Sequence, residues 1–128
     1  MITKSETQKV IKSANFLNDK GYARKIEEST ISFLGDRVNF IITFERYSDV
    51  SDILIKFVQK NEIYSVGWIA CVRSGLSINP HQRLENVLAL LSYIRENYSS
   101  VTNRDYCKES DLLIKDFIEK ERKNKKYD

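Results

Sequence analysis

The sequence predicts an α+β fold: an N-terminal helix, an antiparallel meander of three or four strands, then two or three helices packed on one face of the sheet. Two β-rich segments join across Gly35-Asp36 and a third follows a polar break, so residues 30–59 indicate the meander. Residues 4–20 and most of the chain after residue 79 instead carry apolar residues at helical spacing. A helix, a meander and a helical half, in that order, are typical of an α+β domain.

The first helix is expected to begin near residue 4. Thr3 with Glu6, and Ser5 with Gln8, both have the spacing of a capping box. Gly21 is expected to end the helix, because glycine accepts the left-handed conformation found after many helices. The apolar stripe of this helix consists of Val10, Ile11, Ala14 and Leu17.

The meander is expected to turn one apolar face of each strand toward the core. Gly35 should have a positive φ, as the first residue of a two-residue turn. Residues 22–29 are charged and predict either a loop or the exposed start of the first strand, and the connection at residues 47–51 is polar and longer. Alternation along the strands assigns the core face to Ile31, Phe33, Val38, Phe40, Ile42, Phe44, Ile53, Ile55 and Phe57.

The opposite face of these strands is more apolar than a fully solvated sheet requires. Either the segment 63–72 covers part of it, or it is a contact surface for a partner. The candidate contact residues on this face are Ile41, Thr43, Glu45, Tyr47, Leu54, Lys56 and Val58.

Residues 63–73 are compatible with two different elements. As a fourth strand they would alternate the side chains of Tyr64, Val66, Trp68, Ala70 and Val72. As a short helix capped by Ser65, they would gather Tyr64, Trp68 and either Cys71 or Val72 on one side. Gly67 and Ala70 are poor strand residues, which favours the helix. Ser74-Gly75 should end the element.

Two helices are expected in the C-terminal half. Asn79 as cap, Pro80 in the first position and Gln82 at the reciprocal capping position predict a helix that runs to about Tyr98. Its buried stripe is expected to be Leu84, Val87, Leu88, Leu91 and Ile94, with Arg83, Glu85, Arg95 and Glu96 in water. After a loop at residues 102–103, the apolar side of a last helix is expected to be Tyr106, Leu113, Ile114, Phe117 and Ile118.

Composition and charge indicate one globular domain over residues 1–128. The net charge is +3, and the last ten residues hold five basic and three acidic side chains. Residues 119–128 are therefore expected to form a frayed basic tail, while the near-neutral remainder argues against a broad nucleic-acid face. The N-terminus lacks the apolar core of a signal peptide, so a cytoplasmic protein is expected. Cys71 and Cys107 lack metal-site spacing and are expected to be reduced, buried thiols.

No recognised motif for catalysis, a cofactor or a metal is found in the sequence. His81 is the one histidine and is expected at a solvated helix start. Four scattered glycines make no phosphate loop, and Glu27 and Glu28 would point to opposite faces of a strand. The chain is therefore expected to be non-enzymatic, with no cofactor and no metal.

Parts of the sequence resemble small uncharacterised proteins of Gram-positive bacteria. The resemblance lies in residues 83–88 and 91–98, in Tyr106, Cys107 and Ser110, and in the helix and strand layout around residues 31–33, 38–42 and 44–46. Several small α+β proteins of this style are immunity proteins, which neutralise a secreted toxin by binding it. The resemblance implies a protein partner, such as a toxin, and no catalytic residues. The alternative is a small nucleic-acid-associated or regulatory protein that acts through its basic tail.

Overall fold

The computed structural model describes residues 2–44, 51–77 and 82–126 and confirms the α+β architecture. One antiparallel sheet runs in the order β1-β2-β3-β4-β5, and each strand pairs with the next in sequence. The strands are β1 (Ala23–Ile26), β2 (Thr30–Leu34), β3 (Val38–Phe44), β4 (Ser51–Phe57) and β5 (Glu62–Ser65). The helices are α1 (Lys4–Ser13), α2 (Asn15–Asp19), α3 (Val66–Ser74), α4 (Arg83–Glu96), α5 (Tyr98–Val101) and α6 (Arg104–Lys126).

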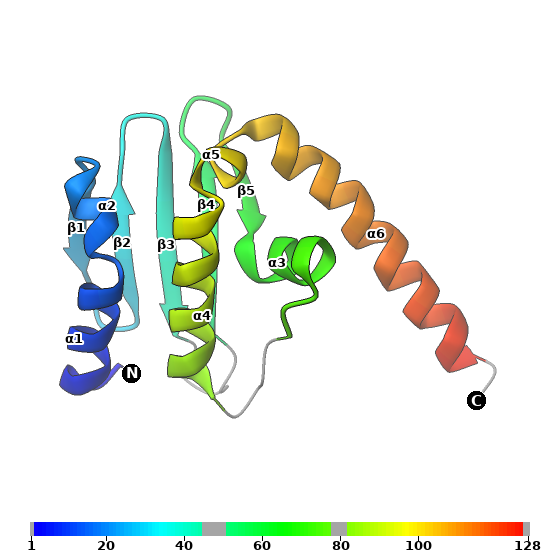
Figure 1. Cartoon of the computed structure of the whole chain (residues 1–128), viewed down its shortest axis with the longest axis horizontal. Helices are drawn as coiled ribbons and strands as arrows, with labels where there is room; N and C mark the ends of the chain where they lie inside the picture. The colour runs from blue at the N-terminus through cyan, green and yellow to red at the C-terminus, as the bar shows by residue number, and fades with distance from the viewer. Residues whose placement is uncertain (1, 45–50, 78–81, 127–128) are drawn as a thin grey trace.

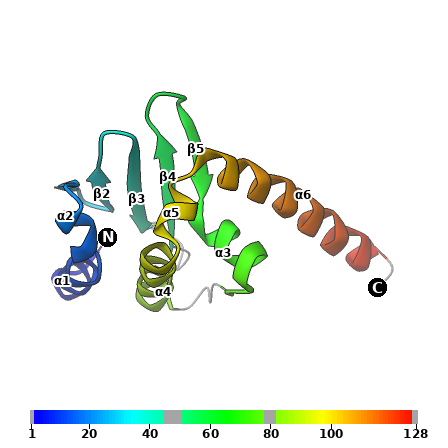
Figure 2. The same cartoon turned by 45° about the horizontal axis from the view of Figure 1, so that its top comes forward.

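The hydrophobic core lies between one face of the sheet and the helices. Helices α1 and α4 lie side by side on this face, and α3 completes the cover beyond β5 (Figures 1 and 2). Buried and half-buried side chains alternate along the whole of β3 and β4, as an antiparallel sheet with one covered face requires. The predicted core face is confirmed, because all of its side chains are buried: Ile31, Phe33, Val38, Phe40, Ile42, Phe44, Ile53, Ile55 and Phe57.

The sheet has five strands, where the sequence predicted three or four. The first addition is β1, formed by the charged segment that was expected to be a loop or the start of the first strand. The second is β5, and residues 63–73 prove to contain both of the alternative elements. The strand ends at Ser65 and the helix begins at Val66. Ser65 caps this helix as expected, because its hydroxyl accepts the backbone N–H of Trp68 at 3.1 Å.

At the N-terminus, the Thr3–Glu6 capping box is confirmed, with both of its reciprocal hydrogen bonds present. The helix ends at Ser13, and the short α2 continues the chain to Asp19. Gly21 follows this second helix with a φ of 93°, as expected of a residue that ends a helix.

The β2–β3 turn differs from the prediction in length and in the role of Gly35. Three residues, 35–37, separate the two strands, and the φ of Gly35 is not positive. Glycine is needed there for space: a Cβ atom would lie 2.8 Å from both the Tyr22 ring and the Val38 carbonyl oxygen.

Helix α4 begins at Arg83, so Gln82 is the residue before the helix and its side chain makes no capping hydrogen bond. The predicted cap at Asn79, together with Pro80 and His81, lies outside the described residues. The helix ends at Glu96, and α5 follows it as a separate turn. Its buried residues are Asn86, Val87, Leu90, Leu91, Tyr93 and Ile94.

Some expectations about the faces of α4 are wrong. Leu84 and Leu88 of the predicted stripe are only half-buried, and the helix turns Leu90 into the core instead. Arg83 does not simply face water, because its guanidinium is bonded to the carboxylate of Glu6 on α1.

Candidate protein-binding surface

Helix α6 leaves the body of the molecule at an angle and extends beyond it (Figures 1 and 2). Its first turn is tied to β5 through a bidentate ion pair. The Arg104 guanidinium donates to the two carboxylate oxygens of Glu62, with Nε–Oε2 3.0 Å and Nη2–Oε1 2.5 Å. These hydrogen bonds, with a further one from the Tyr64 hydroxyl, lower the pKa of Glu62 to about 2. The start of α6 is therefore fixed to the edge of the sheet.

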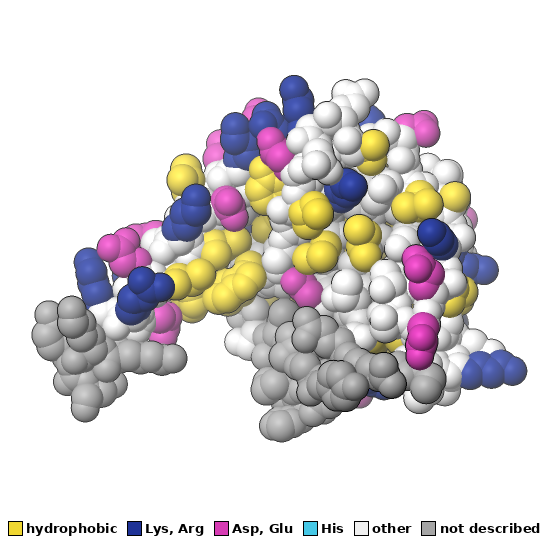
Figure 3. All heavy atoms as spheres, turned by 180° about the vertical axis from the view of Figure 1, so that it is seen from behind, with side chains coloured by type: hydrophobic (Ala, Val, Ile, Leu, Met, Phe, Trp, Pro, Cys, Tyr) yellow, Lys and Arg dark blue, Asp and Glu magenta, His cyan; other side chains and the backbone are white. Residues whose placement is uncertain are grey.

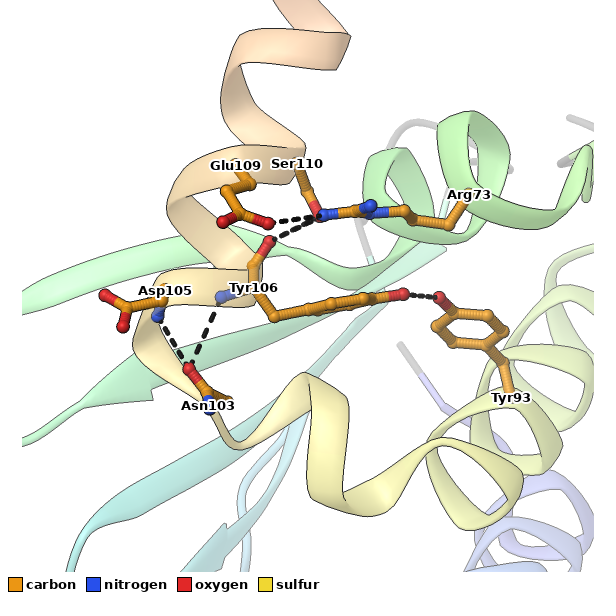
Figure 4. Close-up of polar contacts among 7 residues, drawn as sticks. All are labelled: Arg73, Tyr93, Asn103, Asp105, Tyr106, Glu109 and Ser110. Carbon is orange, nitrogen blue, oxygen red and sulfur yellow. Dashed lines mark hydrogen bonds and ion pairs between the residues drawn. The ribbon is translucent and has the colours of Figure 1, made fainter.

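A second set of contacts ties the next turn of α6 to α3 and α4 (Figure 4). Arg73 on α3 donates from Nε to the Ser110 hydroxyl at 2.9 Å and from Nη2 to the Tyr106 carbonyl at 3.3 Å. Its guanidinium also lies over the Tyr106 ring, 4.3 Å from the centroid. The Tyr106 hydroxyl in turn forms a 2.7 Å hydrogen bond with the hydroxyl of Tyr93 on α4. These contacts hold the first two turns of α6 against α3 and α4.

The cysteines differ in their surroundings. Both are free. Cys107, in the anchored part of α6, is buried as expected and donates its thiol hydrogen to the Val101 carbonyl, 3.3 Å away. Burial raises the pKa of this thiol to about 12, so it is not a nucleophile at neutral pH. Cys71 on α3 is only half-buried, contrary to expectation.

Beyond Ser110, the apolar side of α6 is largely uncovered. The sequence predicted that Leu113, Phe117 and Ile118 would be buried, but they are 43%, 39% and 37% exposed, and Leu112 is 67% exposed. Ile114 alone among these neighbours packs against the core. The helix also continues to Lys126, where the sequence predicted fraying from residue 119. Apart from Ile114, the apolar side chains of α6 beyond Ser110 therefore lie beyond the core and stay partly exposed.

Trp68 of α3 faces this part of α6. Its indole ring makes an edge contact with the Phe117 ring, at a centroid distance of 6.1 Å, and 41% of its surface stays exposed. A hollow of about 330 Å³ opens beside the two rings. Its lining residues are Ser51, Asp52, Ser65, Gly67, Trp68, Cys71, Leu76, Ser77 and Phe117. Apolar side chains gather along the side of α6 that faces the body (Figure 3). We refer to Trp68, Leu113, Phe117 and Ile118 as the arm surface.

Asp52 on β4 fixes the start of α3, and with it the position of Trp68. One carboxylate oxygen accepts the backbone N–H groups of Ile53 at 2.7 Å and Gly67 at 2.9 Å. The other accepts the Ser65 hydroxyl at 2.5 Å. Burial raises the pKa of Asp52, although all three hydrogen bonds act in the opposite direction. The Asp52 carboxylate therefore bonds both to the residue that caps α3 and to the first turn of that helix. It also lines the hollow.

The sheet face that the sequence offered as a contact surface is present but interrupted. Ile41 and Leu54 lie opposite each other in the β3–β4 register and are half-buried. Thr43 and Lys56 share their face and are also half-buried, and Val58 is 42% exposed. Glu45 and Tyr47 lie outside the described residues. Since polar side chains separate the apolar ones, this face is less continuous than the arm surface, and its role in binding stays a prediction.

The sequence also allowed the segment 63–72 to cover part of this outer face of the sheet. Helix α3 instead buries Val66, Ile69 and Ala70 in the core with α4. Ile63, on β5 at the sheet edge, is 54% exposed and extends the apolar part of the face.

The arm surface was missed by sequence reasoning, although a signal for it exists. Apolar residues 112–114 and 117–118 occupy a wider sector of α6 than one packing stripe needs. Trp68 lies in a helix that is apolar on most sides, which does not reveal which side chain stays outside. The charged side chains that anchor α6, Glu62, Arg73 and Arg104, come from segments far apart in sequence.

Within residues 2–44, 51–77 and 82–126, no three His, Cys, Asp or Glu side chains gather as metal ligands would. In the same ranges, no helix combines the length and the apolar character needed to cross a membrane. Comparison with protein-family models, with curated proteins and with solved structures finds no match.

Proposed function

We propose that this chain is a protein-binding module, and that its partner docks on the arm surface. The observation that carries the proposal is an apolar surface on a firmly anchored helix. The first two turns of α6 are held by two arginines, Arg73 and Arg104, while the apolar side chains beyond them stay in contact with water. Exposed apolar patches of this kind often mark interaction sites.

The size of the arm surface supports this proposal. Its exposed parts amount to about 300 Å², taking about 150–250 Å² for each large side chain. A standard interface buries about 800 Å² on each partner, of which somewhat more than half is apolar. The arm surface therefore supplies most of the apolar share of one side of a standard interface. Trp68 is of the residue type that contributes most to binding energy, and Phe117 is of a type enriched at interfaces.

The shape of the surface favours a helical or extended segment of the partner. Between α6 and α3, the Phe117 and Trp68 rings meet and line a hollow that forms a short groove. An amphipathic helix could lay its apolar side into such a groove. Charged side chains of both signs flank it on α6, including Asp111, Lys115 and Asp116. These would orient the partner and speed the encounter.

The most specific form of the proposal is neutralisation of a toxin by an immunity protein. It rests on the resemblance of the sequence to small α+β proteins of that style, and the arm surface supplies a place for the contact. In this form the bound chain obstructs the toxin sterically, and no group of the chain performs chemistry.

The test is to co-express this chain with the product of the gene adjacent to its own and to measure growth and complex formation. We expect a complex, protection from toxicity, and at least about tenfold weaker binding for the double variant Leu113→Ala/Phe117→Ala. Both side chains are already partly exposed, so the variant should remain folded. Glu119→Ala is the matched control, because it changes the opposite side of the same helix and should bind as wild type does.

Two results would contradict the proposal. Equal binding by the double variant would remove the arm surface from the interface. A chain that forms dimers on its own, and loses them in the double variant, would assign this surface to a second copy of the chain rather than to a different protein. Both measurements are made on the full chain by calorimetry and light scattering.

A further inference from the structure

A second cleft lies at the end of the sheet where the α2–β1 connection, the β2–β3 loop and α5 meet (Figure 1). It consists of two hollows of about 220 Å³ and 380 Å³, which share the residues Arg37, Tyr98 and Thr102. The first hollow is also lined by Lys20, Gly21, Tyr22, Gly35, Asp36 and Val38, and the second by Ser99, Asn103 and Arg104.

Two cations line this cleft without a carboxylate partner in the described ranges of the chain. The Lys20 ammonium lies over the Tyr98 ring, 4.2 Å from its centroid, so the aromatic face holds it at the mouth of the first hollow. Arg37 is exposed in the β2–β3 loop and lines both hollows. Arg104 also reaches the second hollow, but its charge is matched by Glu62. Asp36 is the opposing charge in the first hollow.

A pair of tyrosine hydroxyls adds a hydrogen-bond donor. The hydroxyl oxygens of Tyr22 and Tyr98 are 2.6 Å apart, so one hydroxyl donates to the other. The accepting hydroxyl keeps its own hydrogen for a further acceptor. Burial and the hydrogen bond with Tyr98 raise the pKa of Tyr22, while nearby Arg37 acts in the opposite direction. The Tyr22 hydroxyl therefore stays protonated at neutral pH beside the Arg37 guanidinium.

The second hollow offers further polar groups. The side-chain oxygen of Asn103 accepts the backbone N–H groups of Asp105 and Tyr106, which leaves the amide NH₂ as a donor. Ser99 is exposed at the same hollow. By contrast, the Thr102 hydroxyl donates to the Tyr98 carbonyl at 2.7 Å, so it can only accept from a ligand. The combination of cations with hydroxyl and amide donors is typical of sites for oxygen-bearing anions.

We propose that this cleft binds an oxyanion of the phosphate type between Lys20 and Arg37, with the tyrosine pair donating to it. Two connected hollows hold more than one phosphate group, so the site fits a diphosphate better than a single phosphate. It lies apart from the arm surface and does not depend on the protein-binding proposal.

The experiment is a titration of the full chain with sodium pyrophosphate and with inorganic phosphate at constant low ionic strength, followed by amide NMR shifts. We expect saturable shifts at residues 20–22, 35–38 and 98–103, with pyrophosphate binding more tightly. Arg37→Gln and Lys20→Gln should each weaken pyrophosphate binding about five- to tenfold, because each removes one unit of charge close to the ligand. Both side chains are exposed, so the variants should fold.

Two further variants make the test specific. Asp36→Asn removes the opposing carboxylate and should tighten binding about two- to fivefold. Lys4→Gln makes the same charge change at an exposed position in the first turn of α1, at the other end of the helical layer from the cleft (Figure 1), and should leave the affinity unchanged. A nucleoside diphosphate that binds more tightly than pyrophosphate would assign the cleft to a phosphorylated organic ligand, and weaker or equal binding would assign it to the free anion.

The proposal is overturned if pyrophosphate gives no saturable shifts up to about 10 mM, which corresponds to a binding free energy below about 3 kcal/mol. It is also overturned if Lys4→Gln weakens binding as much as Arg37→Gln does, since the effect would then follow net charge alone.

Discussion

At Gly35 the backbone passes so close to the Tyr22 ring and to the Val38 carbonyl that the position has no space for a side chain. The backbone N–H of Gly35 donates to the Val38 carbonyl and to the side-chain oxygen of Asn39, each at 3.1 Å, which fixes this approach. Tyr22 in turn packs against Phe40 of the core, with ring centroids 5.7 Å apart. A single glycine therefore allows the tyrosine to close over the end of the core and to reach Tyr98.

Adding one methyl group at this position should be costly. We expect Gly35→Ala to lower the free energy of unfolding by about 1–3 kcal/mol, because the Val38 carbonyl is backbone and cannot move aside freely. Urea unfolding measures the loss. Asp36→Ala, at the next and exposed position of the loop, should change stability by less than about 0.5 kcal/mol. A Gly35→Ala protein as stable as wild type would show that the loop does not approach Tyr22 this closely.

At the scale of one element, α6 is a helix with two unlike halves. The N-terminal half is held by Asn103 as cap, by the Arg73 and Arg104 contacts and by buried Cys107. The C-terminal half has ion pairs of its own, Asp116–Lys120 at 3.0 Å and Glu119–Lys123 at 3.9 Å, between exposed side chains. Such pairs contribute only about 0.3–0.5 kcal/mol each, so the last turns add little to the stability of the fold.

Deletion of residues 119–128 tests this division. Because the side chains of residues 119–124 are exposed, we expect the free energy of unfolding to fall by less than about 1 kcal/mol. Binding of a protein partner should survive, since Trp68, Leu113 and Phe117 remain. A thermal melt and a binding titration check the two statements.

The same deletion tests the alternative function, nucleic-acid binding through the basic tail. A nucleic-acid protein acting through its basic tail should lose its binding on deletion, and the intact chain should lose affinity steeply between low and physiological salt. DNA or RNA binding with both properties would replace the protein-binding proposal.

At the scale of the whole molecule, the N-terminal and C-terminal halves are tied together at Arg83. Its guanidinium donates to both carboxylate oxygens of Glu6, with Nε–Oε2 2.9 Å and Nη2–Oε1 2.7 Å. The carbonyl of Arg83 accepts the hydroxyl of Ser51 at 2.8 Å, and the guanidinium lies 5.8 Å from the centroid of the Phe44 ring. Helices α1 and α4 and the two central strands thus meet at one residue.

Stability should depend on pH through Glu6. Its hydrogen bonds with Arg83 are the main reason why the pKa of this carboxyl falls from 4.5 to about 2 in the folded chain. Because the unfolded chain takes up the proton first, the stabilisation is complete above about pH 4.5 and disappears as the pH falls through 2. The paired side chains are only 16% and 26% exposed, and we expect the contribution at neutral pH to be about 1–2 kcal/mol.

The variant Glu6→Gln isolates this contribution, because glutamine can keep the capping hydrogen bond with Thr3 but carries no charge. The difference from wild type in urea unfolding should be full at pH 7 and should shrink between pH 4.5 and 2. Glu28→Gln, at an exposed carboxylate, is the control and should show no such trend. A difference that stays constant with pH would mean that the ion pair is not the source of the stabilisation.

The sequence by itself determined the α+β class, the alternating core face of the central strands and the Thr3–Glu6 cap. Each of these depends on residues close together in the chain, where the periodicity of a strand or the spacing of a capping box is read directly. The short edge strands β1 and β5 have four residues each, too few for alternation to separate them from loop or helix. For that reason residues 63–73 suggested two elements, and both are present.

Only the tertiary structure decided which apolar stripe is covered. Leu113 and Phe117 of α6 have the spacing of core residues, and they stay exposed because Arg73 and Arg104 aim the helix past the edge of the core. The cleft beside Arg37 arises in the same way, from segments that only the fold brings together. A local pattern records that a face is apolar, whereas long-range packing determines what, if anything, lies against it.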